Sequence, residues 1–242
     1  MSDPGTTDNV AARIDRVDWA HVASELEESG RALIEQVLRP PECDALAALY
    51  PRQDCVRSRV VMARHGFGQG EYRYFSYPLP DLIAALRTTL YPRLVPVANR
   101  WAERMGIDAR YPDDHAAYIE RCHKAGQTKP TPLLLRYGAD DYNCLHQDLY
   151  GDQIFPMQAV FLLSAPEADF TGGEFVLTEQ RPRMQSRVEV VPLRKGDAVI
   201  FAVNQRPRRG TRGYYRVTMR HGVSRLRAGE RYTAGVIFHD AA

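Results

Sequence analysis

Three residues with metal-binding side chains stand out in the second half of the chain: His146, Asp148 and His221. Side chains alternate between the two faces of a strand, so His146 and Asp148, at positions i and i+2, point to the same side. For His221 to join them, the chain must return to the same point 75 residues later. Two imidazoles and one carboxylate hold non-haem Fe(II) and leave coordination positions open. The spacing therefore predicts an iron site that can also bind O₂.

A candidate co-substrate residue, Arg231, follows His221 by ten residues. Gly229 predicts a tight turn, after which Arg231 and Thr233 alternate onto one face of a strand. A buried guanidinium is costly unless an anion pairs with it, and the carboxylate of 2-oxoglutarate is suited to that role. An ion pair with an internal Asp or Glu is the structural alternative. These residues predict an Fe(II)/2-oxoglutarate-dependent dioxygenase that couples oxidative decarboxylation of 2-oxoglutarate to C–H hydroxylation.

The composition indicates one compact unit. The chain has 242 residues, of which 44% are hydrophobic and 26% are charged, as in ordinary globular proteins. No apolar run approaches the ~18 residues needed to cross a bilayer. Residues 1–8 are polar and predict a disordered tail, and no apolar stretch of a signal peptide follows. We therefore expect a cytoplasmic protein with a single oxygenase domain over residues 9–242.

The elements of the first half alternate between helix and strand. Helical spacing of apolar residues covers residues 19–38 and stops before Pro40 and Pro41, after which a second short helix begins. Residues 57–63 and 71–77 read as a pair of strands, and residues 79–107 return to helix. Residues 9–115 are therefore predicted to form helical and strand support for the rest of the chain.

The second half changes to short apolar runs bounded by Gly, Pro or Asp. Several short strands at this spacing indicate an all-β sandwich or barrel. Together with the metal residues, they predict a double-stranded β-helix, or jelly roll, over residues 116–242, with the N-terminal helices packed on its major sheet. The fold class expected is mainly β with helical support (α+β). The predicted strands are residues 132–137, 158–163, 174–177, 188–191, 197–203, 215–221 and 232–238.

Charge is distributed unevenly along the chain. The formal net charge is +2, yet residues 181–231 contain 14 Lys or Arg against three acidic residues, a local charge of +11. A basic stretch of this size attracts an anionic partner such as DNA or RNA. A biased use of Arg over the whole chain is the alternative explanation.

Over residues 130–240 the sequence resembles the 2-oxoglutarate/Fe(II) oxygenase superfamily, with echoes of two branches. Arg136-Tyr137 followed by His146-Gln147-Asp148 is similar to the AlkB-type nucleic acid demethylases, a resemblance that implies contact between Tyr137 and 2-oxoglutarate. Leu135 stands where those enzymes carry an Asn. Gly172-Gly173-Glu174 and the ten-residue gap from His221 to Arg231 resemble the prolyl-hydroxylase-type enzymes instead.

The whole chain also resembles a bacterial family of predicted oxygenases that is proposed to act on damaged, methylated DNA. The resemblance lies in residues 63–66, 71–75 and 173–182. The resemblance implies a role in DNA repair, with substrate contacts on the two N-terminal strands. Aromatic side chains there would stack on a base and Arg would meet phosphate. The candidate substrate residues are Arg64, His65, Tyr72, Arg73 and Tyr74.

Two other functions remain open on the sequence. A prolyl-hydroxylase-like hydroxylase of a peptide or amino acid would use the same cofactors. A non-catalytic cupin-like metal-binding or sensor module would share the barrel, because such folds host many functions. That module needs no carboxylate-binding Arg231, so this residue distinguishes it from an oxygenase.

Overall fold

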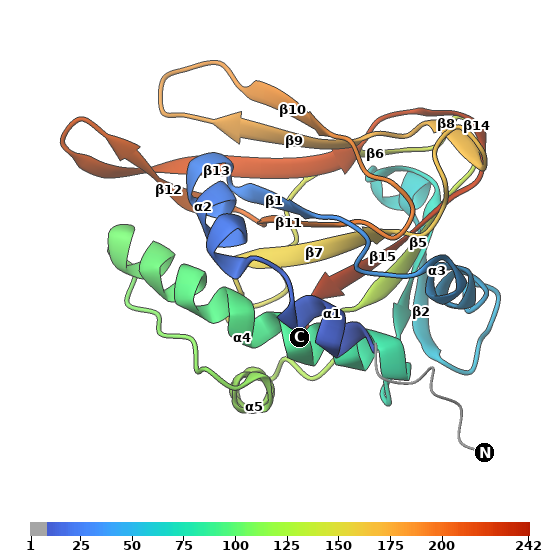
Figure 1. The fold of residues 1–242 in the computed structure, drawn as a ribbon, viewed down its shortest axis with the longest axis horizontal. Coiled ribbons are helices and arrows are strands. Elements are labelled where there is room, and N and C mark those ends of the chain that lie inside the picture. The colour runs from blue at the N-terminus through green and yellow to red at the C-terminus, as the bar shows by residue number, and fades with distance from the viewer. Residues whose placement is uncertain (1–8) are drawn as a thin grey trace.

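The computed structural model describes residues 9–242, so the predicted disordered tail lies outside the described residues. Helices, a seven-stranded sheet and a six-stranded sheet form three stacked layers (Figure 1). One apolar cluster fills the space between the helices and the larger sheet, and a second lies between the two sheets. The predicted α+β class with a jelly-roll core is confirmed.

The sheets are antiparallel throughout. The larger sheet has the strand order β1-β11-β7-β15-β5-β4-β2, and the smaller one β10-β9-β13-β6-β3, with β12 paired to β13. A two-stranded sheet joins β14 to β8. The strands are β1 Arg31–Ile34, β2 Val56–Val61, β3 Gly68–Gln69, β4 Glu71–Phe75, β5 Leu133–Tyr137, β6 Tyr142–His146, β7 Met157–Leu162, β8 Phe170–Gly172, β9 Phe175–Gln180, β10 Arg187–Val191, β11 Ala198–Ala202, β12 Gln205–Gly210, β13 Gly213–Val223, β14 Leu226–Gly229 and β15 Arg231–Ile237.

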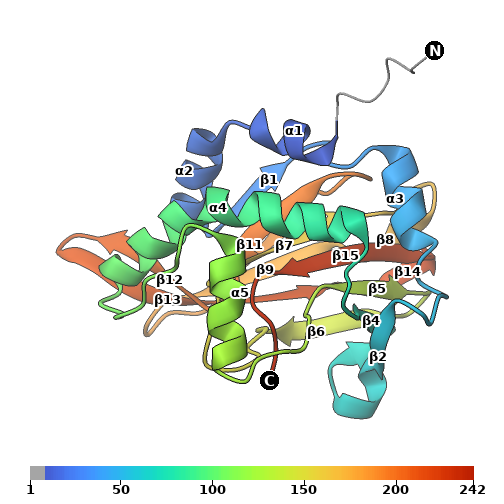
Figure 2. The same ribbon diagram turned by 90° about the horizontal axis from the view of Figure 1, so that it is seen from below.

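The longest helix, α4, covers the outer face of the larger sheet (Figure 2). Leu86, Leu90 and Leu94 recur at intervals of four and are buried, which confirms the predicted helix over residues 79–107. No helix within residues 9–242 is long and apolar enough to cross a membrane. The helices are α1 Val10–Asp15, α2 Trp19–Ser29, α3 Pro40–Ala47, α4 Asp81–Arg104 and α5 His115–Lys124, with a 3-10 helix at Met62–His65.

The predicted helix over residues 19–38 is wrong in its second half. Helix α2 ends at Ser29 because Gly30 adopts the left-handed conformation, with φ at 77°. The chain then forms the edge strand β1, which pairs with β11 and buries Ala32 and Ile34 on alternate positions. The apolar spacing of these four residues is compatible with a helix or a strand, and Gly30 ends the helix so that a strand forms.

A buried ion pair ties α4 to the C-terminal segment. The Arg87 guanidinium lies 2.8 Å from the Asp240 carboxylate, and the two side chains are 2% and 0% exposed. Arg87 also donates to the Ile237 carbonyl at 2.8 Å, while the Tyr77 hydroxyl donates to Asp240 at 2.9 Å. Removing one partner from a buried pair leaves an uncompensated charge.

We expect Asp240→Ala to lower the free energy of unfolding by about 3–5 kcal/mol, because Arg87 would stay buried without its partner. The double variant Arg87→Met/Asp240→Leu should recover much of that loss, since it removes both charges. Denaturant unfolding of the three proteins measures the difference. Equal losses in the single and double variants would show that the pair is not the cause.

Candidate active site

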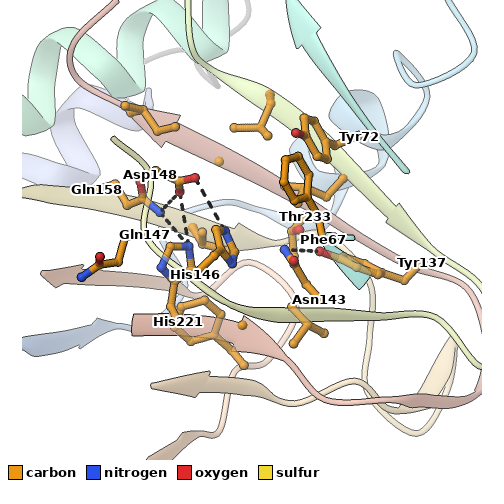
Figure 3. A pocket seen from close by; sticks show the side chains of 18 of the residues that line it. Phe67, Tyr72, Tyr137, Asn143, His146, Gln147, Asp148, Gln158, His221 and Thr233 are labelled. Carbon is orange, nitrogen blue, oxygen red and sulfur yellow. Dashed lines mark hydrogen bonds and ion pairs between the residues drawn. The ribbon is translucent and has the colours of Figure 1, made fainter. Parts of the chain in front are cut away.

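Strand register brings the two predicted metal-binding histidines together. His146 ends β6 and His221 lies on β13, and the two are direct partners across the antiparallel pair. Their ring centroids are 4.1 Å apart. The predicted strand over residues 132–137 is β5, and His146 lies on a further strand, β6, which was not predicted and which Gly138 and a turn separate from β5. Asp148 follows two residues after β6 and turns toward both rings (Figure 3).

The three side chains form a compact donor set. Asp148 Oδ2 lies 3.3 Å from His221 Nε2, and Asp148 Oδ1 lies 3.6 Å from His146 Nε2. One ligand atom from each residue lies within 4.8 Å of the other two. The Nδ1 of His146 is 2.8 Å from the Cys144 carbonyl, so an Nδ1–H donor there leaves the Nε2 lone pair facing its neighbours.

The protonation states suit metal binding. Burial lowers the pKa of His221, and the charge of His146 lowers it further, so His221 is a neutral imidazole at neutral pH. Burial alone would raise the pKa of Asp148, but its contacts with His221, and with His146 and Tyr150, stabilise the carboxylate form more than burial opposes it and so lower the pKa. Neutral imidazole and ionised carboxylate are the forms that ligate a metal. Two such nitrogens and one oxygen fit non-haem Fe(II).

The donor set opens into a cavity of about 190 Å³ between the two sheets. Most of its wall is apolar, and the polar groups gather around the metal residues and at Arg231. The predicted co-substrate residues Tyr137 and Thr233 lie in the same wall, and Thr233 shares the face of β15 with Arg231, as strand alternation predicted. The lining includes Phe67, Tyr72, Tyr137, Asn143, His146, Gln147, Asp148, Tyr150, Gln158, Phe175, His221, Arg231 and Thr233.

Arg231 is a buried cation without a carboxylate partner among the described residues. It is 1% exposed, and its Nε and Nη1 atoms have no hydrogen-bond partner there. Burial lowers the pKa of Arg231 to about 10. Its guanidinium carbon lies 5.5 Å from the Tyr137 ring, the cross-strand partner on β5. A buried cation of this kind needs an anion, and its planar fork matches a carboxylate.

Where the sequence predicted a tight turn at Gly229, the structure has a one-residue break between β14, which ends at Gly229, and β15, which begins at Arg231. Gly229 has φ at 82°, and a Cβ atom there would lie 2.0 Å from the Asp169 carbonyl oxygen. Only glycine allows this close approach between β14 and β8. β15 begins after this break, and Arg231 and Thr233 face the cavity from it.

The five candidate substrate residues separate into two groups. Tyr72 lines the cavity, and His65 stacks on the lining residue Phe67 at 5.3 Å between ring centroids. Arg64 is exposed on the same 3-10 helix. Tyr74 is buried, and its hydroxyl donates to Tyr150.

Arg73 points to the other face of the sheet. Its guanidinium carbon lies 4.8 Å from the centroid of the Tyr50 ring, because neighbouring residues on a strand face opposite sides. Arg73 therefore lies away from the cavity lining, so the predicted substrate contact does not fit its position. Tyr74 lies on the same face as Tyr72, behind the lining residue Tyr150, and its contact with substrate stays a prediction.

Four residues around the cavity were not predicted from the sequence to belong to the site. Asn143 donates to the Tyr137 hydroxyl at 3.4 Å, and Gln158 and Tyr150 donate to Asp148. Phe67 lines the opening beside Tyr72. Tyr150 could have been predicted to contact Asp148, because the two residues are only two positions apart in the sequence. The others come from strand pairings that no local pattern reveals.

Comparison with known proteins finds sequence relatives and solved structures of similar fold. Two uncharacterized proteins of Mycobacterium tuberculosis are each 49% identical over 168 residues, which is 69% of this chain and 72% of the relative. A 2-oxoglutarate/Fe(II) oxygenase family oxidoreductase from Burkholderia pseudomallei is 18% identical, with a TM-score of 0.56 over 94% of both chains. A prolyl-4-hydroxylase from Pseudomonas putida is 16% identical, with a TM-score of 0.53 over 90% of this chain and 96% of that one.

A family model covers most of the chain. Residues 70–241 match the Oxygenase-NA family, which is described as "Oxygenase, catalysing oxidative methylation of damaged DNA". The match contains both histidines of the donor set, Asp148 and Arg231. The chain therefore belongs to the Oxygenase-NA family of oxygenases, and its fold is that of the 2-oxoglutarate/Fe(II) oxygenases.

Proposed function

We propose that this oxygenase uses Fe(II), 2-oxoglutarate and O₂ to oxidise methylated bases of damaged DNA. The observation that carries the cofactor assignment is the buried, unpaired Arg231 in the same cavity as the His146, Asp148 and His221 donor set. A metal-binding or sensor module has no use for such a cation, and membership of an oxygenase family also argues against that alternative.

The chain's residues divide the work between ligation and orientation. His146, Asp148 and His221 would hold the iron, and Arg231 would pair with the distal carboxylate of 2-oxoglutarate. Thr233 and Tyr137 would add hydroxyl groups beside that carboxylate. Bound Fe(II) and 2-oxoglutarate supply the reduction of O₂, with release of succinate and CO₂ and insertion of one oxygen atom into a substrate C–H bond. The apolar wall excludes water from that reaction.

The chemistry on a damaged base follows from that oxygen insertion. Hydroxylation of an N-methyl group gives an N-hydroxymethyl group, which breaks at the C–N bond to release formaldehyde and the unmethylated base. The methyl group is thus removed. Base repair of this kind requires the target base to leave the stack or to lie in a single strand. Incubation with methylated single-stranded DNA should therefore produce formaldehyde, with one succinate for each formaldehyde in addition to the succinate that forms without DNA.

The basic stretch provides a candidate surface for phosphates. Arg206 and Arg231 are buried, and within residues 9–242 several others pair with carboxylates. Four exposed arginines of the basic stretch have no carboxylate partner within residues 9–242 and lie on the β9–β10 loop and the β12–β13 hairpin, which project from the same end of the smaller sheet (Figure 1): Arg183, Arg209, Arg212 and Arg216. Arg220 lies further along β13, and Arg194 and Arg227 are exposed outside both loops.

The tip of this hairpin lies within reach of a short nucleic acid that also enters the cavity. β13 runs directly from Gly213 at the tip to His221 in the donor set. At a rise of about 3.3 Å per residue, that distance is about 26 Å. A single strand several nucleotides long would therefore span both sites, with its backbone on the arginines and one base near the metal.

We expect Arg209→Gln/Arg212→Gln to weaken binding of a single-stranded oligodeoxynucleotide and to flatten its salt dependence. Each lost phosphate contact removes counterion release, so two contacts reduce the slope of log affinity against log salt by about 1.4. Fluorescence anisotropy at several salt concentrations measures both changes. Arg194→Gln/Arg227→Gln removes the same charge near the other end of the sheets and should bind like the wild type.

The outcome of that titration also decides between substrate classes. If the wild-type protein binds no oligonucleotide at low salt, nucleic acid is the wrong substrate class. The prolyl-hydroxylase-like alternative, with a peptide or amino acid as substrate, would then be preferred, in line with the ten-residue gap from His221 to Arg231.

A further inference from the structure

The carboxylate of Asp148 accepts one hydrogen bond on each oxygen. The Tyr150 hydroxyl donates to Oδ1 at 2.6 Å, and the Gln158 amide Nε2 donates to Oδ2 at 2.8 Å. Gln158 Nε2 also lies 3.2 Å from His221 Nε2, so this amide touches two members of the donor set (Figure 3). Asp148 and Gln158 are 8% and 3% exposed, so water has little access to these bonds.

Tyr150 is itself held in place by the N-terminal half of the chain. Tyr74 on β4 donates its hydroxyl hydrogen to the Tyr150 hydroxyl at 3.1 Å, and Tyr150 then donates to Asp148. The Tyr74 and Tyr150 rings meet edge to face, with centroids 6.3 Å apart. Arg57 stacks on the other side of Tyr74, 4.4 Å from its centroid. The chain of donors therefore runs from strand β4 to the metal-binding carboxylate.

These contacts restrict how Asp148 can bind a metal. A carboxylate offers about four lone-pair sites, and the two donors occupy one on each oxygen. The carboxylate can then rotate only by breaking a buried hydrogen bond, which costs free energy because water does not replace it. A carboxylate held in this way stays oriented toward the two imidazoles, so it does not have to reorient when the ion binds.

We propose that Tyr150 and Gln158 are positioning residues for the metal centre, and that Tyr74 acts through Tyr150. This inference rests on the proposed function, because it takes His146, Asp148 and His221 as the ligands. It also gives Tyr74 a role that differs from substrate contact. Donors to ligating side chains commonly change metal affinity by about 10- to 100-fold.

The test is Co(II) binding to the purified protein, followed by its visible absorption, which needs no turnover. Tyr150→Phe and Gln158→Met each remove one donor with little change in volume. We expect about tenfold weaker Co(II) binding in each and a shifted absorption band, because Asp148 can rotate. Tyr74→Phe should cause a smaller loss. Thermal unfolding of the metal-free variants shows whether each one folds.

The matched control is Tyr214→Phe, which removes an exposed hydroxyl group near the tip of the β12–β13 hairpin. Within residues 9–242, Tyr214 is absent from the cavity lining and from the donors to Asp148, so this variant should bind Co(II) like the wild type. Wild-type affinity and spectrum in both Tyr150→Phe and Gln158→Met would overturn the inference. If the wild-type protein bound no Co(II), the proposed metal centre would fail instead. Two variants at separate oxygens keep the test decisive if one does not fold.

Discussion

Replacing His221 by alanine is expected to abolish Fe(II) binding and the formation of succinate from 2-oxoglutarate. His221 supplies one of three ligand atoms from near the end of β13; the residue is 5% exposed, and its ring contacts those of His146 and Phe201. No other His, Cys, Asp or Glu of the described residues joins this cluster to replace it. Anaerobic titration with Fe(II) and a succinate assay without primary substrate measure the two losses.

The matched control for this variant is His21→Ala. His21 lies on α2 with 67% of its side chain exposed, outside the donor set. It should bind iron and turn over 2-oxoglutarate like the wild type. Succinate production by His221→Ala at the wild-type rate would show that the iron is held elsewhere. Normal thermal unfolding of the metal-free variant would show that lost activity does not reflect lost structure.

Much of the donor set could be predicted because its determinants are local. His146 and Asp148 are two residues apart, which keeps their side chains close although β6 ends at His146 and Asp148 lies beyond it. Arg231 and Thr233 share a face because side chains alternate along β15. The position of His221 opposite His146 needed one more inference, the return of a distant strand in a jelly roll.

The residues that support the donor set could not be predicted in the same way. Gln158 reaches Asp148 from β7, and its role depends on the pairing of β7 with β11 and β15. Tyr74 carries no local sign that separates it from Tyr72, although one binds Tyr150 and the other lines the cavity. Such contacts arise from tertiary packing, which overrides local pattern, as it also does where β1 replaces the end of a predicted helix.

Replacing Arg231 by methionine should weaken 2-oxoglutarate binding while leaving Fe(II) binding intact. Loss of one partner from a buried charge pair costs about 2–5 kcal/mol, or roughly 30- to 4000-fold in affinity. The visible charge-transfer band that forms when 2-oxoglutarate joins the anaerobic Fe(II) protein measures co-substrate binding, and anaerobic titration with Fe(II) alone measures metal binding. Arg225→Met is the control, because Arg225 is 71% exposed and pairs with Asp140 on the surface. An unchanged band in Arg231→Met would exclude this residue as the carboxylate site.

The same variant should unfold at a higher temperature than the wild type when no ligand is present. The free protein keeps the Arg231 guanidinium buried with Nε and Nη1 unpaired among the described residues, and desolvation of that charge opposes folding. Methionine fills similar space without a charge, so stability rises as co-substrate binding falls. If Arg231 instead formed a structural ion pair, Arg231→Met would leave a buried carboxylate without its partner. The variant would then unfold at a lower temperature than the wild type. Thermal unfolding of the metal-free proteins, with and without 2-oxoglutarate, therefore separates a binding site from a structural one.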